Sequence, residues 1–125
     1  MGVSTDGLLG WGVVLGTEFE ERFTEEVYPM MCRILNIEYD GLKSEPGMIE
    51  LAEAGLEMQM HCHMDHPMWN LIARESEVCA WRGYPNDTLD LTPKPEWLST
   101  FREVVDLPKL GISKQPGWIL SSLWA

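Results

Sequence analysis

The chain of 125 residues has the length of one domain, and its 45% hydrophobic and 23% charged residues are the composition of an ordinary globular protein. Its formal net charge of -11 argues against binding to nucleic acid phosphates and to anionic membrane surfaces. No apolar run reaches the roughly 18 residues that a spanning helix needs, and three cysteines without a signal peptide favour a reducing, cytoplasmic setting.

The acidic residues are concentrated in the N-terminal half of the chain. Residues 1–57 carry 12 acidic and 3 basic side chains, whereas residues 58–125 carry 8 and 6. Such a negative surface either serves solubility or steers the protein onto a basic partner. The densest acidic stretch supplies the predicted partner-binding residues, which are Glu18, Glu20, Glu21, Glu25 and Glu26.

The first readable elements are a strand and a helix. Residues 8–15 form a short apolar run with interior glycines, which is typical of a strand that has a bulge or a close backbone approach at Gly10 or Gly12. A capping box then predicts a helix over residues 18–27. Pro29 either ends this helix or opens a further turn, and residues 36–54 show turn signals without a readable period.

A strict alternation of apolar and polar residues predicts a strand over residues 56–64, with one buried face and one wet face. Short connections then predict strands over 68–74 and 78–84, arranged as an antiparallel meander. After a proline-rich loop, residues 97–105 carry the inward stripe of an amphipathic helix. Residues 118–124 form a last strand that is apolar on both sides.

These elements predict a single acidic α+β domain over residues 1–125. We expect an antiparallel sheet of four to six strands, with two or three helices packed on one face. A strand that is apolar on both sides is either central in a covered sheet or pressed against another subunit, so a homodimer through the last strand is also expected.

All three histidines of the chain lie within residues 61–66. On a strand, His61 and His63 project from the same face, a spacing that can place two imidazoles on one zinc ion. Asp65 or His66 would then supply a third ligand from the turn. The alternative is a wet strand face that happens to hold histidines, with Cys62 packed in the core and no cofactor bound.

No other segment has the pattern of a catalytic site. Ser121 and Ser122 lie on a predicted strand rather than at a nucleophile elbow, and the N-terminal glycines lack the spacing of a phosphate-binding loop. The histidines are expected on the opposite face of their strand from Cys62, which leaves that thiol without a base. The sequence therefore favours a protein that is not an enzyme.

Four segments together resemble small accessory proteins encoded by bacteriophages: residues 6–13 (DGLLGWGV), 61–68 (HCHMDHPM), 82–85 (RGYP) and 116–124 (PGWILSSLW). This resemblance implies the cytoplasm of a bacterial host. It also implies a non-enzymatic accessory protein that binds and inhibits a host or defence protein, such as a CRISPR effector, through its acidic surface. The alternatives are a metal-dependent domain built on the histidine cluster, and a small-ligand sponge or virion component.

Overall fold

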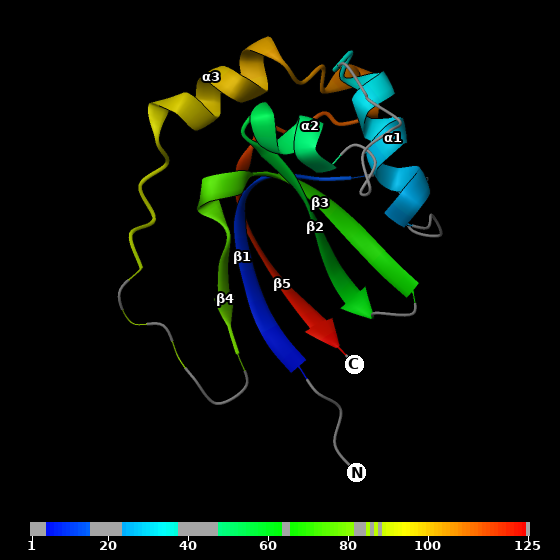
Figure 1. Ribbon diagram of the computed structural model, residues 1–125. Coiled ribbons are helices and arrows are strands. Elements are labelled where there is room, and N and C mark those ends of the chain that lie inside the picture. The colour runs from blue at the N-terminus through cyan, green and yellow to red at the C-terminus, as the bar shows by residue number, and fades with distance from the viewer. Residues whose placement is uncertain are drawn as a thin grey trace.

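The computed structural model describes residues 5–15, 24–37, 48–63, 66–81, 85, 87 and 89–124. Within these ranges, the structure describes the backbone but not the side chains of Thr5, Thr24, Glu25, Glu26, His66 and Trp124. The elements, drawn in Figure 1, are β1 (Thr5–Val14), α1 (Thr24–Ile34), α2 (Met48–Glu53), β2 (Leu56–His63), β3 (His66–Ala73), the 3-10 turn η2 (Arg74–Ser76), β4 (Val78–Ala80), α3 (Pro95–Glu103), the 3-10 turn η3 (Pro108–Leu110) and β5 (Gly117–Trp124).

The described strands form one five-stranded sheet in the order β3-β2-β5-β1-β4. This confirms the α+β class and the expected number of strands. The expectation of a purely antiparallel sheet is wrong, because β2 and β5 run parallel where Cys62 pairs with Leu123 and His63 with Trp124. The chain between these two strands includes β3, β4 and α3, which provides the long crossover that a parallel pair needs.

The sheet closes on itself. In addition to its pairing with β2, β3 pairs with β1 through residues 70–72 and 12–14, so β1, β3, β2 and β5 form a ring of four strands. We call this arrangement the strand ring. Its closure gives the sheet an inner side, to which every second residue of each strand points.

The expected meander ends after β3, because β4 pairs with residues 7–9 of β1 rather than with β3. Both β3 and β4 therefore lie along the same edge of β1. Where β1 changes partner, the backbone N–H of Trp11 donates a 2.8 Å hydrogen bond to the Ser76 hydroxyl, which itself donates to the Ala73 carbonyl at 2.6 Å. Ser76 in η2 thus accepts a hydrogen bond from the Trp11 N–H, which pairs with neither β3 nor β4.

The glycines of β1 allow the close contact between β1 and β3. A Cβ at Gly12 would overlap the Leu71 carbonyl oxygen and lie 2.7 Å from Ile72 Cα. A Cβ at Gly10 would lie 2.8 Å from Ile72 Cγ2. The close backbone approach expected at Gly10 or Gly12 is confirmed at Gly12, whereas the atoms closest to Gly10 belong to side chains.

The three helices pack on the outer face of the sheet and gather at one of its ends (Figure 1). Trp11 of β1 packs against α3 in this core, with its ring centroid 6.0 Å from Trp97 in a tilted arrangement and 5.6 Å from Phe101 in an edge-to-face arrangement. The buried strand residues that share this core are Trp11, Val13, Leu56, Met58, Trp69, Leu71 and Ala73. Helices on one face were expected, and the structure confirms them.

The helices differ in detail from the prediction. Residues 18–23 lie outside the described part of the chain, and α1 runs from Thr24 through Pro29 to Ile34. Residues 36–54, which had no readable period, contain the short helix α2. Within the stripe predicted for residues 97–105, Trp97, Phe101 and Val105 are buried as expected, whereas Leu98 is exposed and α3 ends at Glu103. No helix in the described ranges is long and apolar enough to cross a membrane.

Candidate functional site

A chain of polar side chains lies on the inner side of the strand ring. Gln59 of β2 and Asn70 of β3 are almost fully buried, at 2% and 0% exposure. Gln59 was expected on a wet face, and that expectation is wrong because ring closure covers the second face of the sheet. Burying an amide side chain is costly unless its hydrogen bonds are made, so Gln59 and Asn70 need hydrogen-bond partners inside the strand ring.

Besides each other, Gln59 and Asn70 have partners from three other parts of the fold. Asn70 Nδ2 donates to Gln59 Oε1 and to Ser121 Oγ, each at 3.1 Å. Gln59 Nε2 donates to Glu77 Oε2 at 3.2 Å and to the Leu9 carbonyl at 3.4 Å. The inner polar chain, Glu77–Gln59–Asn70–Ser121, therefore crosses the ring from the segment before β4 to β5.

One end of the inner polar chain is acidic. Burial raises the pKa of Glu57, and the nearby Glu77 carboxylate raises it further, while Arg74 acts in the opposite direction. Burial also raises the pKa of the Cys79 thiol, with smaller contributions from Glu77, Glu57 and Asp6. Both shifts act against the charged form of the group, and the raised pKa makes the Cys79 thiol a poorer nucleophile than an exposed cysteine.

The other end of the chain holds His61. Its Nε2 atom and Asn70 Oδ1 are buried, and apart from each other neither has a hydrogen-bond partner among the described residues. Burial lowers the pKa of His61, and the Asn70 side chain raises it by a smaller amount. The lowered pKa favours the neutral imidazole, whose buried Nε2 atom has the Asn70 side chain beside it.

A pocket of about 590 Å³ opens beside His61, where β2 and β5 separate from each other. Its walls combine the polar side chains of His61 and Ser121 with the apolar side chains of Met68 and Leu120. The full set of lining residues is Gly7, His61, Cys62, Met68, Leu120, Ser121 and Ser122. This volume lies within the range of small-molecule sites.

Cys62 lies on the pocket rather than in the core. Its φ of 71° is in the left-handed region, which interrupts the alternation of β2 at this residue. As a result, Cys62 and His61 line the same pocket, although regular alternation places them on opposite faces. The thiol is half-buried and free of disulfide bonds.

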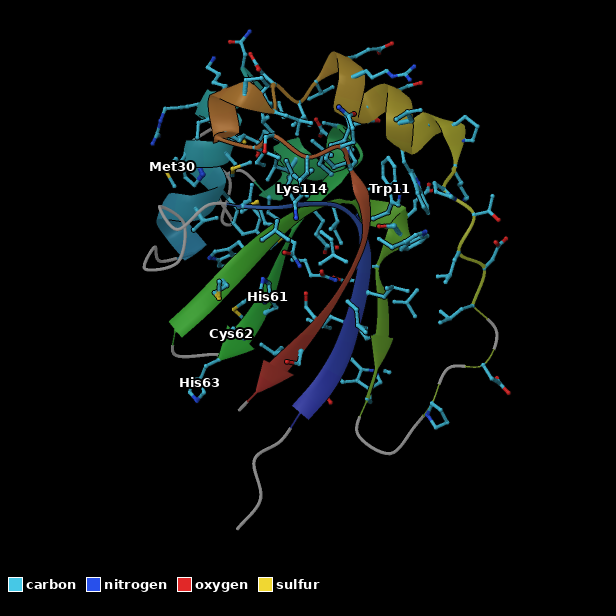
Figure 2. All side chains as sticks on the ribbon, turned by 180° about the vertical axis from the view of Figure 1, so that it is seen from behind. Trp11, Met30, His61, Cys62, His63 and Lys114 are labelled. Atoms are coloured by element: carbon cyan, nitrogen blue, oxygen red, sulfur yellow. The ribbon has the colours of Figure 1, made fainter. Side chains whose placement is uncertain are left out.

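The structure separates the two histidines that were predicted to share a metal ion. Figure 2 shows His61 beside the sheet and His63 beyond the end of β2, directed away from it. Asp65 and the His66 side chain lie outside the described part of the chain. Within that part, no group of three or more metal-ligating side chains is arranged to hold an ion. The zinc site stays a prediction.

The predicted partner-binding residues fall largely outside the described ranges. Glu18, Glu20 and Glu21 are not described, and Glu25 and Glu26 lie in the first turn of α1 without described side chains. The acidic surface therefore stays a prediction from the sequence. The homodimer expected through β5 also stays a prediction.

The segment from β4 to α3 exposes a second surface that the sequence did not single out. Trp81 is 61% exposed, and Leu89 and Leu91 are exposed as well. Asp87 and Asp90 are exposed on the same segment. A 3.0 Å hydrogen bond from the Thr92 backbone N–H helps hold the pKa of Asp90 below its usual value, so this carboxylate is charged. We call this segment, residues 81–94, the Trp81 segment.

Comparison of the chain with models of protein families, with curated proteins and with solved structures finds no match. The candidate function therefore rests on the charge, the exposed side chains and the pocket of this chain.

Proposed function

We propose that this protein is a non-enzymatic binding protein that docks on a basic surface of a host or defence protein and inhibits it. The observation that carries the proposal is the charge, -11 for the chain and concentrated in residues 1–57. Proteins that bind nucleic acid present basic grooves for phosphates, and an acidic protein can compete for such a groove. A CRISPR effector in a bacterial cytoplasm is the partner that best fits this chemistry.

The Trp81 segment supports the same proposal from the described residues. Protein interfaces are centred on a few large side chains, among which Trp is enriched, and are surrounded by polar groups. Trp81 has this character, since it is exposed on a segment that also carries Asp87 and Asp90. Charge would bring the partner close, and the indole would supply the apolar contact.

The test is affinity capture from a bacterial lysate with three matched baits: the native chain, a variant in which Glu18, Glu20, Glu21, Glu25 and Glu26 are replaced by Gln, and Trp81→Ala. We expect the native bait to retain a basic protein at low salt, and both variants to retain much less of it. Arg33→Gln, which raises the net negative charge at an exposed site, is the control and should retain at least as much.

The captured protein is then assayed for its own activity with and without the native chain. Loss of that activity in proportion to bound chain supports inhibition. Equal retention by all three baits, or a partner that remains fully active when saturated, would contradict the proposal.

A further inference from the structure

We propose that the free edge of β5 binds an extended, apolar segment of another protein, which adds to the sheet as a strand and places a carboxylate beside Lys114. The site consists of residues 117–120 of β5, residues 12–15 of β1 and the loop 111–115, and we call it the β5 groove. It is separate from the acidic surface and from the Trp81 segment, so its test is independent of the proposed function.

One edge of β5 has backbone groups without a strand partner. β5 pairs with β1 along its whole length, but on its other edge it pairs with β2 only at Leu123 and Trp124. Between residues 117 and 121, alternate N–H and C=O groups therefore point away from β1, and among the described residues no strand pairs with them. An extended segment can form main-chain hydrogen bonds with these groups.

A groove of about 570 Å³ follows this edge. Four consecutive residues of β5, 117–120, line it, so the groove reaches both faces of the strand rather than one. β2 is fully described and none of its residues lines the groove, so β2 leaves this part of the edge open. A Cβ on Gly117 would meet nothing within 4 Å, which leaves room for another backbone at the start of β5.

The walls of the groove are apolar and accessible to solvent. Val14 and Leu120 are 52% and 82% exposed, and Trp118 and Ile119 are half-buried. Natural proteins commonly protect an exposed sheet edge with charged residues or proline, but residues 117–121 (GWILS) contain neither. An apolar, uncharged edge of this kind favours pairing with another strand.

Charge decides which strand fits. Lys114, labelled in Figure 2, lies three residues before β5 and is the one charged residue among those that line the groove. A second copy of this chain is a poor occupant, because two molecules of net charge -11 repel each other. The occupant is therefore a segment of a different protein, with alternating apolar residues and an acidic side chain that reaches Lys114.

The probe is the peptide acetyl-Thr-Val-Thr-Val-Asp-amide, added to ¹⁵N-labelled full-length protein. We expect saturable amide shifts at Trp118, Ile119 and Leu120, with a Kd of about 1 mM or tighter. The amides of residues 117–121 that point away from β1 should exchange rapidly in the free protein and slowly with the peptide bound. The control peptide carries N-methyl groups on two adjacent central residues, which blocks either of its edges, and it should bind at least about tenfold more weakly.

The role of Lys114 is tested with a second peptide, in which Asn replaces Asp. This change should weaken binding to the native chain about threefold, the size expected for an exposed ion pair, and should have no effect on binding to Lys114→Gln. Lys109→Gln makes the same change of charge at an exposed lysine outside the groove. This control variant should keep the native preference for Asp.

Four results would overturn the proposal: no saturable shift from the peptide, equal binding of the N-methylated peptide, a preference for Asp that persists in Lys114→Gln, or slow exchange of the edge amides in the free protein. Sedimentation of the free protein then identifies what protects the edge in the last case. A dimer would mean that a second copy occupies the edge, and a monomer would mean that the chain covers its own edge.

Discussion

Gly12 and Gly117 lie opposite each other in the β1–β5 ladder, but only Gly117 has room for a side chain. A Cβ at Gly12 would overlap the backbone of β3, whereas a Cβ at Gly117 would meet nothing within 4 Å. The difference arises because β1 carries β3 along its other edge at this point. The pair is therefore an internal test of ring closure.

Gly12→Ala should destabilise the protein by more than about 2 kcal/mol, because the β1 and β3 backbones must move apart. Gly117→Ala is the matched control, and it should change the free energy of unfolding by less than about 1 kcal/mol. Urea unfolding followed by tryptophan fluorescence measures both. Equal effects of the two substitutions would mean that β1 and β3 are not in contact.

Ser76 supplies the hydrogen bond that replaces strand pairing at Trp11. In Ser76→Ala, the buried Trp11 N–H loses its acceptor, so we predict a loss of about 1–3 kcal/mol. Faster hydrogen exchange of the Trp11 amide, measured by NMR, should accompany that loss. Ser113→Ala, at an exposed position, is the control and should change neither quantity. Slow Trp11 exchange retained in Ser76→Ala would contradict the assigned role.

Asn70 and Ser121 should be energetically coupled, because Asn70 Nδ2 donates to Ser121 Oγ inside the strand ring. We expect Asn70→Ala to be destabilising by about 2 kcal/mol or more, since Gln59 and Ser121 both lose a donor. Ser121→Ala alone should be destabilising by about 1 kcal/mol. A double-mutant cycle should give a coupling of at least about 0.5 kcal/mol. Strict additivity would show that the two side chains do not interact.

His61 should make stability depend on pH. Burial lowers its pKa in the folded state, so the unfolded chain binds more protons as the pH falls through the ordinary histidine value of 6.5. The stability that His61 contributes is therefore present above pH 6.5 and is lost as the pH falls. Between pH 7.5 and 5.5, the native chain should lose more stability than His61→Gln.

The measurement is the free energy of unfolding as a function of pH for the native chain and for His61→Gln. The difference between these two curves cancels the contributions of the other histidines. Glu57 acts with the opposite sign, because its raised pKa adds stability at low pH, and its effect is likewise common to both proteins. Parallel curves for the native chain and His61→Gln would mean that His61 is solvated rather than buried.

The sequence predicts those features that depend on local pattern. The alternation in residues 56–64 predicts β2, the spacing of Trp97, Phe101 and Val105 predicts α3, and the glycines at 10 and 12 predict a close backbone approach. The partner that makes this approach is not local. Ring closure places Ile72 and Leu71 against β1, about 60 residues away in the chain, and no periodicity encodes that.

The pocket beside His61 likewise depends on contacts between distant parts of the chain, which local sequence pattern does not predict. Alternation correctly places His61 on the face opposite Met60, but ring closure turns that wet face into a buried one. The positive φ at Cys62 then brings the thiol to the same pocket, a backbone feature that residue type does not signal. Ser121 comes from the end of the chain, so only the tertiary fold joins it to Asn70.

The salt dependence of partner affinity tests the proposed function most directly. With the purified partner, we expect Kd to rise steeply between about 50 and 200 mM salt for the native chain, because screening weakens charge steering. The variant with Gln at positions 18, 20, 21, 25 and 26 should give a flatter dependence. An affinity that does not change with salt, or the same slope for both proteins, would contradict an acidic surface as the binding element.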